Sequence, residues 1–287
     1  MISQQILLTV LAHPDDESFG TGGTLAYYAR QQGAQVHLIC ATRGEAGGVA
    51  PKFLEGYTSI ADRREAELRC AAGVLGLTGV YFLNYRDSGM PGSPDNQHPQ
   101  ALVQAPLDEV AGKVASTIRR LRPQVVLTFD PIGGYKHPDH IAIHRATVRA
   151  FQLAGDPAYA DPEGLPAFQA QKLYYHVFPK RMFRIIVRLL PLTGRDPRRF
   201  GKNGDIDLVD LVESGDFPVH ASINARSVQE QRDAAAACHA SQLEGGPPNR
   251  GPIGWVWRKL GGKEHFMRAY PPVNGSLHEK DLFEGVL

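Results

Sequence analysis

One histidine and three carboxylates occupy five consecutive positions near the N-terminus, in the run His13-Pro14-Asp15-Asp16-Glu17. A catalytic zinc ion takes about three protein ligands of the histidine or carboxylate type and leaves one position for water. A neighbouring carboxylate that is not a ligand can act as a general base on that water. Three adjacent carboxylates also repel one another unless a cation offsets their charge. The run therefore indicates part of a metal site, or else a solvated acidic turn that caps the following helix.

A second cluster, His137-Pro138-Asp139-His140, lies far later in the chain, and His144 follows it. Proline suits the first turn of a helix, so His140 and His144 would share a helix face at a spacing that lets paired histidines hold zinc. His137 and His140 are also close enough to face one site, and Asp139 can orient a neighbouring imidazole. Taken alone, the cluster could be surface histidines at a helix start. The two clusters together favour a metal site, although spacing leaves open which of the three histidines bind.

Short apolar strands alternate with amphipathic helices around these clusters. Ile6–Leu11 is an apolar run with β-branched residues, which is typical of a strand buried on both faces. The clearest helix covers Leu107–Leu121, where apolar residues recur every three or four positions. We expect strands at 6–11, 35–41, 80–83, 125–129 and 172–177, and helices at 24–32, 61–73, 107–121 and about 138–153.

This alternation predicts an α/β fold with a mostly parallel, Rossmann-like sheet and helices on both faces. In such sheets, ligands bind beyond the carboxyl ends of the strands. The first acidic run follows the first strand, and the histidine cluster follows the fourth. The predicted sheet could therefore bring the two clusters together although they are distant in sequence.

The composition excludes several other classes of protein. The 287 residues carry a formal net charge of +1, which gives no reason to expect binding to nucleic acid or to an anionic membrane. The N-terminal apolar run has no Lys or Arg before it, unlike a signal peptide, and no stretch approaches the ~20 apolar residues of a membrane span. We expect a cytoplasmic location.

The three cysteines, Cys40, Cys70 and Cys238, are widely spaced and form no CxxC pair. An odd number of cysteines is poor material for a disulfide framework. We expect buried, reduced side chains that behave as small hydrophobic residues. Cys40 lies inside a predicted strand, which argues against a nucleophilic role.

We expect a single α/β domain over residues 1–287, with a variable basic and apolar insertion at about 178–217. The part from Pro179 to Lys202 combines large apolar side chains with eight Lys or Arg residues, and the acidic stretch Asp205–Asp216 follows it. A packed helix with solvated cations is the favoured interpretation. Contact with a membrane through residues 180–192, or a lid over the site, is the alternative.

The glycine-rich turn Gly20-Thr21-Gly22-Gly23 follows the first strand, as in a dinucleotide site. Its spacing does not match GxGxxG, and no Asp or Glu ends the second strand, where Ala41-Thr42-Arg43 stands. We interpret these glycines as positions of close packing between a helix and the sheet. No GxSxG elbow is present, so a serine hydrolase is not expected.

The motifs AHPDDE at Ala12–Glu17 and HPDH at His137–His140 resemble those of the LmbE-like, PIG-L-type de-N-acetylases. This family includes the N-acetylglucosaminyl-phosphatidylinositol deacetylases and the deacetylases and amidases of mycothiol and bacillithiol metabolism. RDSGM, at Arg86–Met90, is similar to the mycothiol-type branch. Other segments that look familial are Arg64–Leu68, Gly133–Tyr135 and His239–Gln242. The segment between Phe178 and Phe217 does not align to the family pattern, which leaves the substrate open.

The resemblance implies a ligand set and a base. His13, Asp16 and His140 would bind Zn²⁺, although another divalent metal such as Fe²⁺ could take their place. Asp15 would be the general base for the attacking water. Glu17 receives no role from the resemblance.

The resemblance also implies roles around these ligands. His137 would act as general acid or oxyanion stabiliser, with Asp139 behind it. Tyr135 would help to polarise the amide oxygen. Arg64 and Asp87 would bind polar groups of the substrate. We expect His144 to be structural or to support a ligand.

The function that follows is removal of the N-acetyl group from a GlcNAc-containing small molecule, with an amino-sugar conjugate as the only expected partner. An amidase that cleaves a larger N-acyl or thiol-conjugate amide would use the same zinc site. A non-catalytic sugar-binding protein with a decayed site is disfavoured because both motifs are complete. A Rossmann-type oxidoreductase is disfavoured because the fingerprint is missing.

Overall fold

The computed structural model describes residues 4–194, 196–199, 204, 207–243 and 262–287. One mixed sheet runs through the described chain in the order β3-β2-β1-β4-β5-β7-β6. Strands β1 to β5 are parallel, whereas β7 pairs antiparallel with both β5 and β6. The strands are β1 (Ile6–Leu11), β2 (Gln35–Thr42), β3 (Gly79–Tyr85), β4 (Val125–Phe129), β5 (Lys172–Val177), β6 (Ala221–Asn224) and β7 (Lys263–Tyr270).

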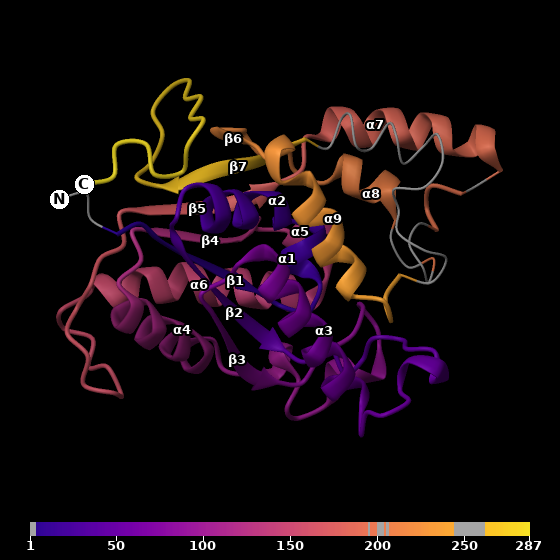
Figure 1. Cartoon of the computed structure of the whole chain (residues 1–287), viewed down its shortest axis with the longest axis horizontal. Coiled ribbons are helices and arrows are strands. Elements are labelled where there is room, and N and C mark those ends of the chain that lie inside the picture. Colours follow the sequence, from indigo (N-terminus) through magenta and orange to yellow (C-terminus); the bar gives the residue numbers. More distant parts are fainter. Residues whose placement is uncertain (1–3, 195, 200–203, 205–206, 244–261) are drawn as a thin grey trace.

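Helices cover both faces of this sheet (Figure 1). Those described are α1 (Asp16–Phe19), α2 (Gly22–Ala26), α3 (Ile60–Leu75), α4 (Leu107–Leu121), α5 (Gly133–Lys136), α6 (Pro138–Gly155), α7 (Lys180–Leu189), α8 (Leu208–Glu213) and α9 (Gln229–Cys238). A π-helical turn at Tyr27–Gln31 continues α2.

Two hydrophobic cores lie on opposite sides of the central strands, because successive side chains of a strand point to opposite faces. In β1, Leu8 packs in a core with Val114 of α4 and Ile143 of α6. The preceding residue, Leu7, packs in a second core with Leu75 of α3. The central strands are therefore buried on both faces, as their continuous apolar sequence predicts.

The predicted α/β fold with a mostly parallel sheet is confirmed. The helix at Leu107–Leu121 and the strand at Val125–Phe129 begin and end where the apolar pattern placed them. The antiparallel edge formed by β6 and β7 was not expected. Strand β6 has four residues, and β7 mixes Lys, Glu, His and Arg with apolar residues, so neither shows a clear alternation.

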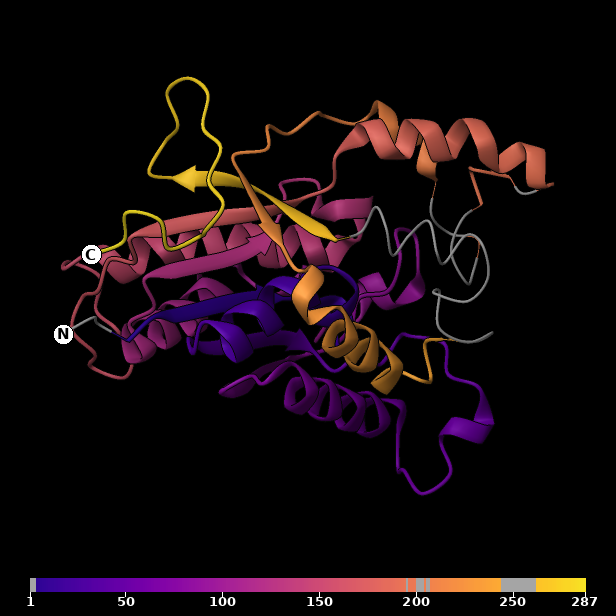
Figure 2. The same ribbon diagram turned by 45° about the horizontal axis from the view of Figure 1, so that its top comes forward.

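The segment expected as an insertion, 178–217, lies between β5 and β6 and contains α7 and α8. Both views place α7 at the end of the molecule opposite to the two termini (Figures 1 and 2). Lys180 Nζ donates to Val212 O at 2.9 Å, which attaches the start of α7 to α8. Ile185 and Leu189 are 53% and 54% exposed, so α7 is only partly packed. None of the described helices is long and apolar enough to cross a bilayer.

The expectation of three reduced cysteines is wrong for two of them. Cys70 of α3 and Cys238 of α9 form a disulfide, with their Cα atoms 5.8 Å apart. The pairing spans 168 residues, so sequence spacing gave no sign that α3 and α9 lie side by side. Cys40 is free and buried, as expected.

Candidate metal centre and active site

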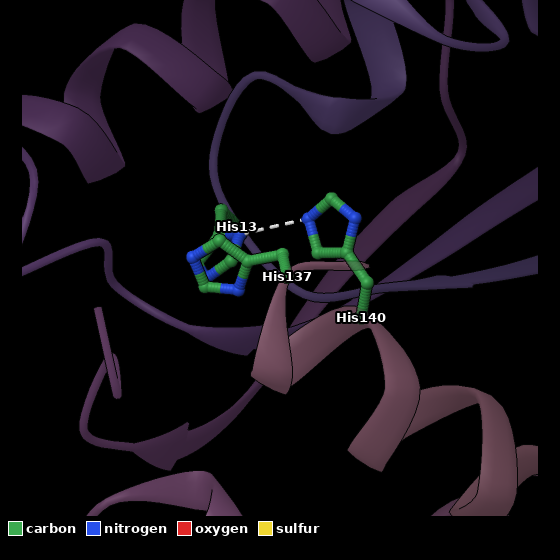
Figure 3. Close-up of side chains that lie close together, drawn as sticks. All are labelled: His13, His137 and His140. Atoms are coloured by element: carbon green, nitrogen blue, oxygen red, sulfur yellow. Dashed lines mark hydrogen bonds between the residues drawn. The ribbon is translucent and has the colours of Figure 1, made fainter. Parts of the chain in front are cut away.

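The two predicted clusters meet at one edge of the sheet. Strands β1 and β4 are hydrogen-bonded neighbours in parallel, so their carboxyl ends lie together. The loop after β1 carries His13, and α6, which follows β4 after a short connection, carries His140 in its first turn. Pro138 begins this helix, and the His137 side chain caps it by accepting the Asp139 N–H. Figure 3 shows His13, His137 and His140 gathered at this edge.

Three candidate ligand atoms converge between the loop and the helix. His13 Nδ1 lies 3.2 Å from His140 Nε2. The Asp16 carboxylate lies 3.2 Å from His140 Nε2 and 3.6 Å from His13 Nδ1. Donor atoms about 2.0–2.1 Å from a tetrahedral zinc ion stand about 3.3 Å apart, so these separations fit one ion.

The outer nitrogens of both rings support this arrangement. His13 Nε2 lies 3.1 Å from Asp139 Oδ2 and 3.5 Å from Asp87 Oδ1. His140 Nδ1 lies 3.1 Å from Gly133 O. A metal-binding histidine almost always donates its other N–H to a carboxylate or a backbone carbonyl. Each ring therefore has its inner nitrogen directed at the shared space, where it could bind a metal ion.

His13 also belongs to two other groupings with potential ligand atoms within 4.8 Å of one another. One contains His137 and His140, and the other contains Asp87 and Asp139. Burial lowers the pKa of His137 well below its ordinary value, and the neighbouring histidines lower it further. The His137 imidazole is therefore neutral, which is the form that binds metal.

Asp15 is held beside these residues in a backbone conformation that side chains rarely adopt, with φ of 127°. Arg64 Nη2 donates to Pro14 O at 2.6 Å and to Asp15 Oδ2 at 2.9 Å. The Asp15 N–H donates to Glu17 Oε2 at 3.0 Å. Burial raises the pKa of Asp15 to about 6, although Arg64 opposes this shift. Strain of this kind persists only where the surroundings fix the residue, and it concentrates at functional sites.

Tyr135 covers the histidines from the loop between β4 and α6. Its ring stands edge-on to His140 with centroids 5.0 Å apart. Gly134 precedes it with φ of +69°, and the Asp130 carboxylate holds the turn by accepting the N–H groups of Ile132 and Gly134. Burial raises the pKa of Tyr135, so its hydroxyl stays protonated and can donate a hydrogen bond.

Comparisons with known proteins show the family of this chain. The sequence model of the family described as "PIG-L: GlcNAc-PI de-N-acetylase" matches residues 8–151, which include both clusters. The chain is 38% identical over 293 residues to a protein of Acidothermus cellulolyticus, covering 98% of this chain and 94% of that one. The chain belongs to the PIG-L family. The resemblance seen in its motifs is thereby confirmed.

The Acidothermus relative is named 1D-myo-inositol 2-acetamido-2-deoxy-alpha-D-glucopyranoside deacetylase. A Streptomyces avermitilis protein of the same name is also 38% identical, over 98% of this chain and 97% of its own length. Among solved structures, a conserved protein from Thermus thermophilus matches with a TM-score of 0.59 and 26% identity. That match covers 94% of this chain and 96% of the other. The PIG-L fold thus extends well beyond residues 8–151.

One predicted partnership differs in this PIG-L protein. Asp139 was expected behind His137, but its carboxylate contacts His13 Nε2 and accepts from both the backbone and the hydroxyl of Ser88. His137 Nδ1 instead accepts the backbone N–H of Asp139 at 3.2 Å. Asp139 sits at the second position of α6, so its N–H points at the capping ring while its side chain crosses to the neighbouring loop.

Glu17, which had no predicted role, is fully buried and pairs with a residue that sequence reasoning did not single out. His239, just beyond α9, lies with Nε2 2.7 Å from Glu17 Oε1. Burial lowers the pKa of His239, but the Glu17 carboxylate more than offsets this and leaves the pKa above its ordinary value. The only sequence sign was that both residues fall in familial segments.

Two further expectations concern His144 and the glycine-rich turn. His144 Nδ1 lies 2.8 Å from Phe129 O, so this histidine supports the end of β4. At the N-terminus of α2, the Glu264 carboxylate accepts the N–H groups of Gly23 and Thr24. A Cβ on Gly23 would come within 2.5 Å of the Ala225 side chain. The turn therefore packs closely, as predicted, and Glu264 fills the place that a dinucleotide phosphate would need.

Proposed function

We propose that this PIG-L protein is a metal-dependent hydrolase that removes the N-acetyl group from a GlcNAc-containing small molecule. The observation that carries the proposal is the convergence of His13, Asp16 and His140, with the buried Asp15 carboxylate beside them. Two relatives that match 98% of this chain are named as deacetylases of a 2-acetamido-2-deoxyglucoside of inositol, which supports the substrate class.

The proposed ligands are His13 Nδ1, His140 Nε2 and an oxygen of Asp16. The two nitrogens are 3.2 Å apart, with Asp16 Oδ1 3.2 Å from His140 and Asp16 Oδ2 3.6 Å from His13, and this spacing suits a tetrahedral ion. Both imidazoles have hydrogen-bond acceptors for their outer nitrogens. We favour zinc, with Fe²⁺ as the alternative, because imidazole and carboxylate ligands suit both. Such an ion supplies Lewis acidity to the amide carbonyl and to the attacking water.

Asp15 is the proposed general base. Asp15 is adjacent in sequence to Asp16, the proposed carboxylate ligand. Its own carboxylate pairs with Arg64, so we place it outside the proposed ligand set. A carboxylate fixed within reach of the attacking water accepts its proton as the carbon–oxygen bond forms. The leaving amine must then receive a proton as the carbon–nitrogen bond breaks, and the protonated Asp15 carboxyl supplies the one that it took from the water.

Hydrogen-bond donors for the developing oxyanion come from the other side of the site. The Tyr135 hydroxyl stays protonated, and His137 lies with its ring 5.9 Å from that of Tyr135. Donors aimed at the place where negative charge develops stabilise the transition state without reorganising. Arg64 and Asp87 are the proposed contacts to polar groups of the substrate, and Asp139 holds His13 in orientation.

Metal analysis combined with product release tests the function directly. The full-length protein should hold about one metal ion and release acetate from N-acetylglucosaminides. Analogues with larger N-acyl groups should react more slowly, whereas preference for them would favour the amidase. Absence of both bound metal and amine release would overturn the enzyme proposal.

Asp15→Asn tests the base, because asparagine keeps the shape of the side chain and tolerates positive φ. We expect kcat to fall roughly 100- to 10,000-fold, the usual contribution of a general base, while the metal content is unchanged. Asp108→Asn, at a surface position of α4 paired with Arg149, is the matched control and should keep its activity. A metal-replete Asp15→Asn protein with nearly normal kcat would show that another group is the base.

A further inference from the structure

A pocket with a volume of about 370 Å³ lies on the outer side of Tyr135. Its size falls within the range of small-molecule sites, which is about 300–1,000 Å³. It is lined by Met90, Pro91, Tyr135, Lys136, Asp207, Asp210 and Leu211. We call it the outer pocket.

The outer pocket begins beside the proposed metal centre. Tyr135 forms part of its wall, and the ring of the same residue contacts His140, with centroids 5.0 Å apart. Met90 follows Asp87 by three residues and brings the RDSGM loop to the pocket. A sugar whose acetamido group reaches the histidines can therefore extend its remaining substituent into this space.

One wall of the outer pocket comes from the segment 178–217. Asp207, Asp210 and Leu211 belong to α8 or cap it, and α8 lies beside α5 (Figure 1). The family match ends at residue 151, well before this helix. The two segments that carry familial motifs, 86–91 and 133–136, and the segment 178–217 thus line one pocket together.

The polar groups of the wall suit hydroxyl groups. Lys136 Nζ and Asp210 Oδ2 form an ion pair at 2.5 Å, and their side chains are 41% and 48% exposed. An ammonium donor beside a carboxylate acceptor can bind two neighbouring hydroxyls of one ring. Met90, Pro91 and Leu211 offer apolar surface to the C–H faces of such a ring. A fatty acyl chain would take the ion pair out of water without offering hydrogen bonds to its remaining N–H groups and carboxylate oxygen.

The charges of the wall disfavour an anionic group. Lys136 is the single cation among the described residues that line the pocket, and Asp210 already pairs with it. One oxygen of Asp207 lies 3.2 Å from Arg198, and its other oxygen caps α8. A phosphate in the pocket would meet two carboxylates without an unpaired cation among these lining residues.

We propose that the outer pocket holds the neutral, polyhydroxylated group attached to the anomeric carbon of the sugar, with Lys136 and Asp210 binding its ring hydroxyls. This inference rests on the proposed deacetylase function and names the residues that select the substrate. A cyclic polyol fits the outer pocket, whereas a phosphorylated or lipid-linked aglycone does not.

The experiment compares two substrates of the metal-replete full-length protein, the inositol glycoside and the methyl glycoside of N-acetylglucosamine. The readout is the ratio of kcat/KM for the inositol glycoside to kcat/KM for the methyl glycoside. Losing a hydrogen bond to a charged group should lower this ratio roughly 10- to 100-fold in Asp210→Ala, mainly through KM for the inositol glycoside. Lys136→Gln is the second variant and should lower the ratio in the same way.

Glu213→Ala is the matched control, since it removes a carboxylate from the same helix outside the outer pocket. It should keep the wild-type ratio. An unchanged ratio in both Asp210→Ala and Lys136→Gln, in proteins that still deacetylate, would overturn the assignment of the outer pocket alone. Failure of the wild-type protein to release acetate from either glycoside would overturn the proposed function and this inference together.

Discussion

The proposed metal centre and the segment 178–217 differ in how deeply their side chains are buried and in how completely their polar groups are paired. At the centre, His13, Asp139 and His140 are almost completely buried, and the two imidazoles and the Asp139 carboxylate have defined partners. In the segment, α7 exposes Ile185 and Leu189, and its ion pairs lie at the surface. The first region therefore tolerates little change, whereas the second can vary with small effects on folding.

This difference suits the buried centre to catalysis and the exposed segment to substrate selectivity. Buried polar networks fix atoms to the accuracy that catalysis needs, because an unpaired member would be strongly destabilising. Surface segments on a fixed scaffold can change their side chains while the scaffold stays intact. In this protein the two regions meet at Tyr135, which borders both the histidines and the outer pocket.

The largest effect of any substitution in either region is expected when one histidine of α6, a proposed metal ligand, is removed. His140→Ala should reduce the bound metal to below about a tenth of an equivalent and slow deacetylation about 1,000-fold or more, equivalent to about 4 kcal/mol of transition-state stabilisation. Metal analysis and acetate release measure both effects.

His144→Ala, one turn along the same helix, is the matched control. It removes the hydrogen bond to Phe129 O and should destabilise folding by about 1–2 kcal/mol while the metal content stays normal. Retention of metal by His140→Ala, or its loss from His144→Ala, would contradict the ligand assignment.

The sequence located the two motifs and the strands that precede them because both are encoded locally, whereas the proposed ligand set came from the family resemblance. Apolar runs define β1 and β4, and the first motif follows β1 directly whereas the second follows β4 after a short connection. The partnership of Glu17 with His239 could not be read in this way, because it joins residues 222 positions apart through helix packing. The disulfide between Cys70 and Cys238 and the contact of Asp139 with His13 have the same origin. The outer pocket depends on α8, which lies outside the residues that the family model matches.

The buried pair of Glu17 and His239 should contribute strongly to folding. Breaking a buried, hydrogen-bonded charge pair by removing one partner costs about 3–5 kcal/mol, so Glu17→Gln should lower the free energy of unfolding by about that amount. Urea unfolding measures the change. In a double-mutant cycle with His239→Gln, the two effects should not be additive. Simple additivity would show that the residues act independently.

His176, at the end of β5 next to the segment 178–217, should make stability depend on pH. Burial lowers its pKa to about 4. The unfolded chain binds this proton near pH 6.5, whereas the folded chain does not bind it until about pH 4. The free energy of unfolding should therefore fall by about 3 kcal/mol as the pH decreases through this window, and the full contribution is present above about pH 6.5. His176→Phe should lose this part of the slope in unfolding measured from pH 7 to 4, and an unchanged slope would refute the assignment.

The smallest effect is expected on α7. The double variant Ile185→Ser, Leu189→Ser changes two exposed side chains and should alter the free energy of unfolding by no more than about 0.5 kcal/mol per site. Its kcat/KM should stay within about twofold of wild type.

Wild-type protein should remain in the supernatant when anionic vesicles are sedimented, because we favour a packed helix over membrane contact. Sedimentation that the double variant abolishes would show that α7 binds membranes.

The link between α3 and α9 has a consequence for the motions of the active-site loop. Helix α3 carries Arg64, which holds Pro14 and Asp15, and His239 follows directly after Cys238 of α9. Since Cys70 and Cys238 are joined covalently, neither helix can separate from the other in a partial opening of the structure. The loop at 13–17 is thus held from two sides by helices that belong to one cooperative unit, and its local unfolding requires both to move together.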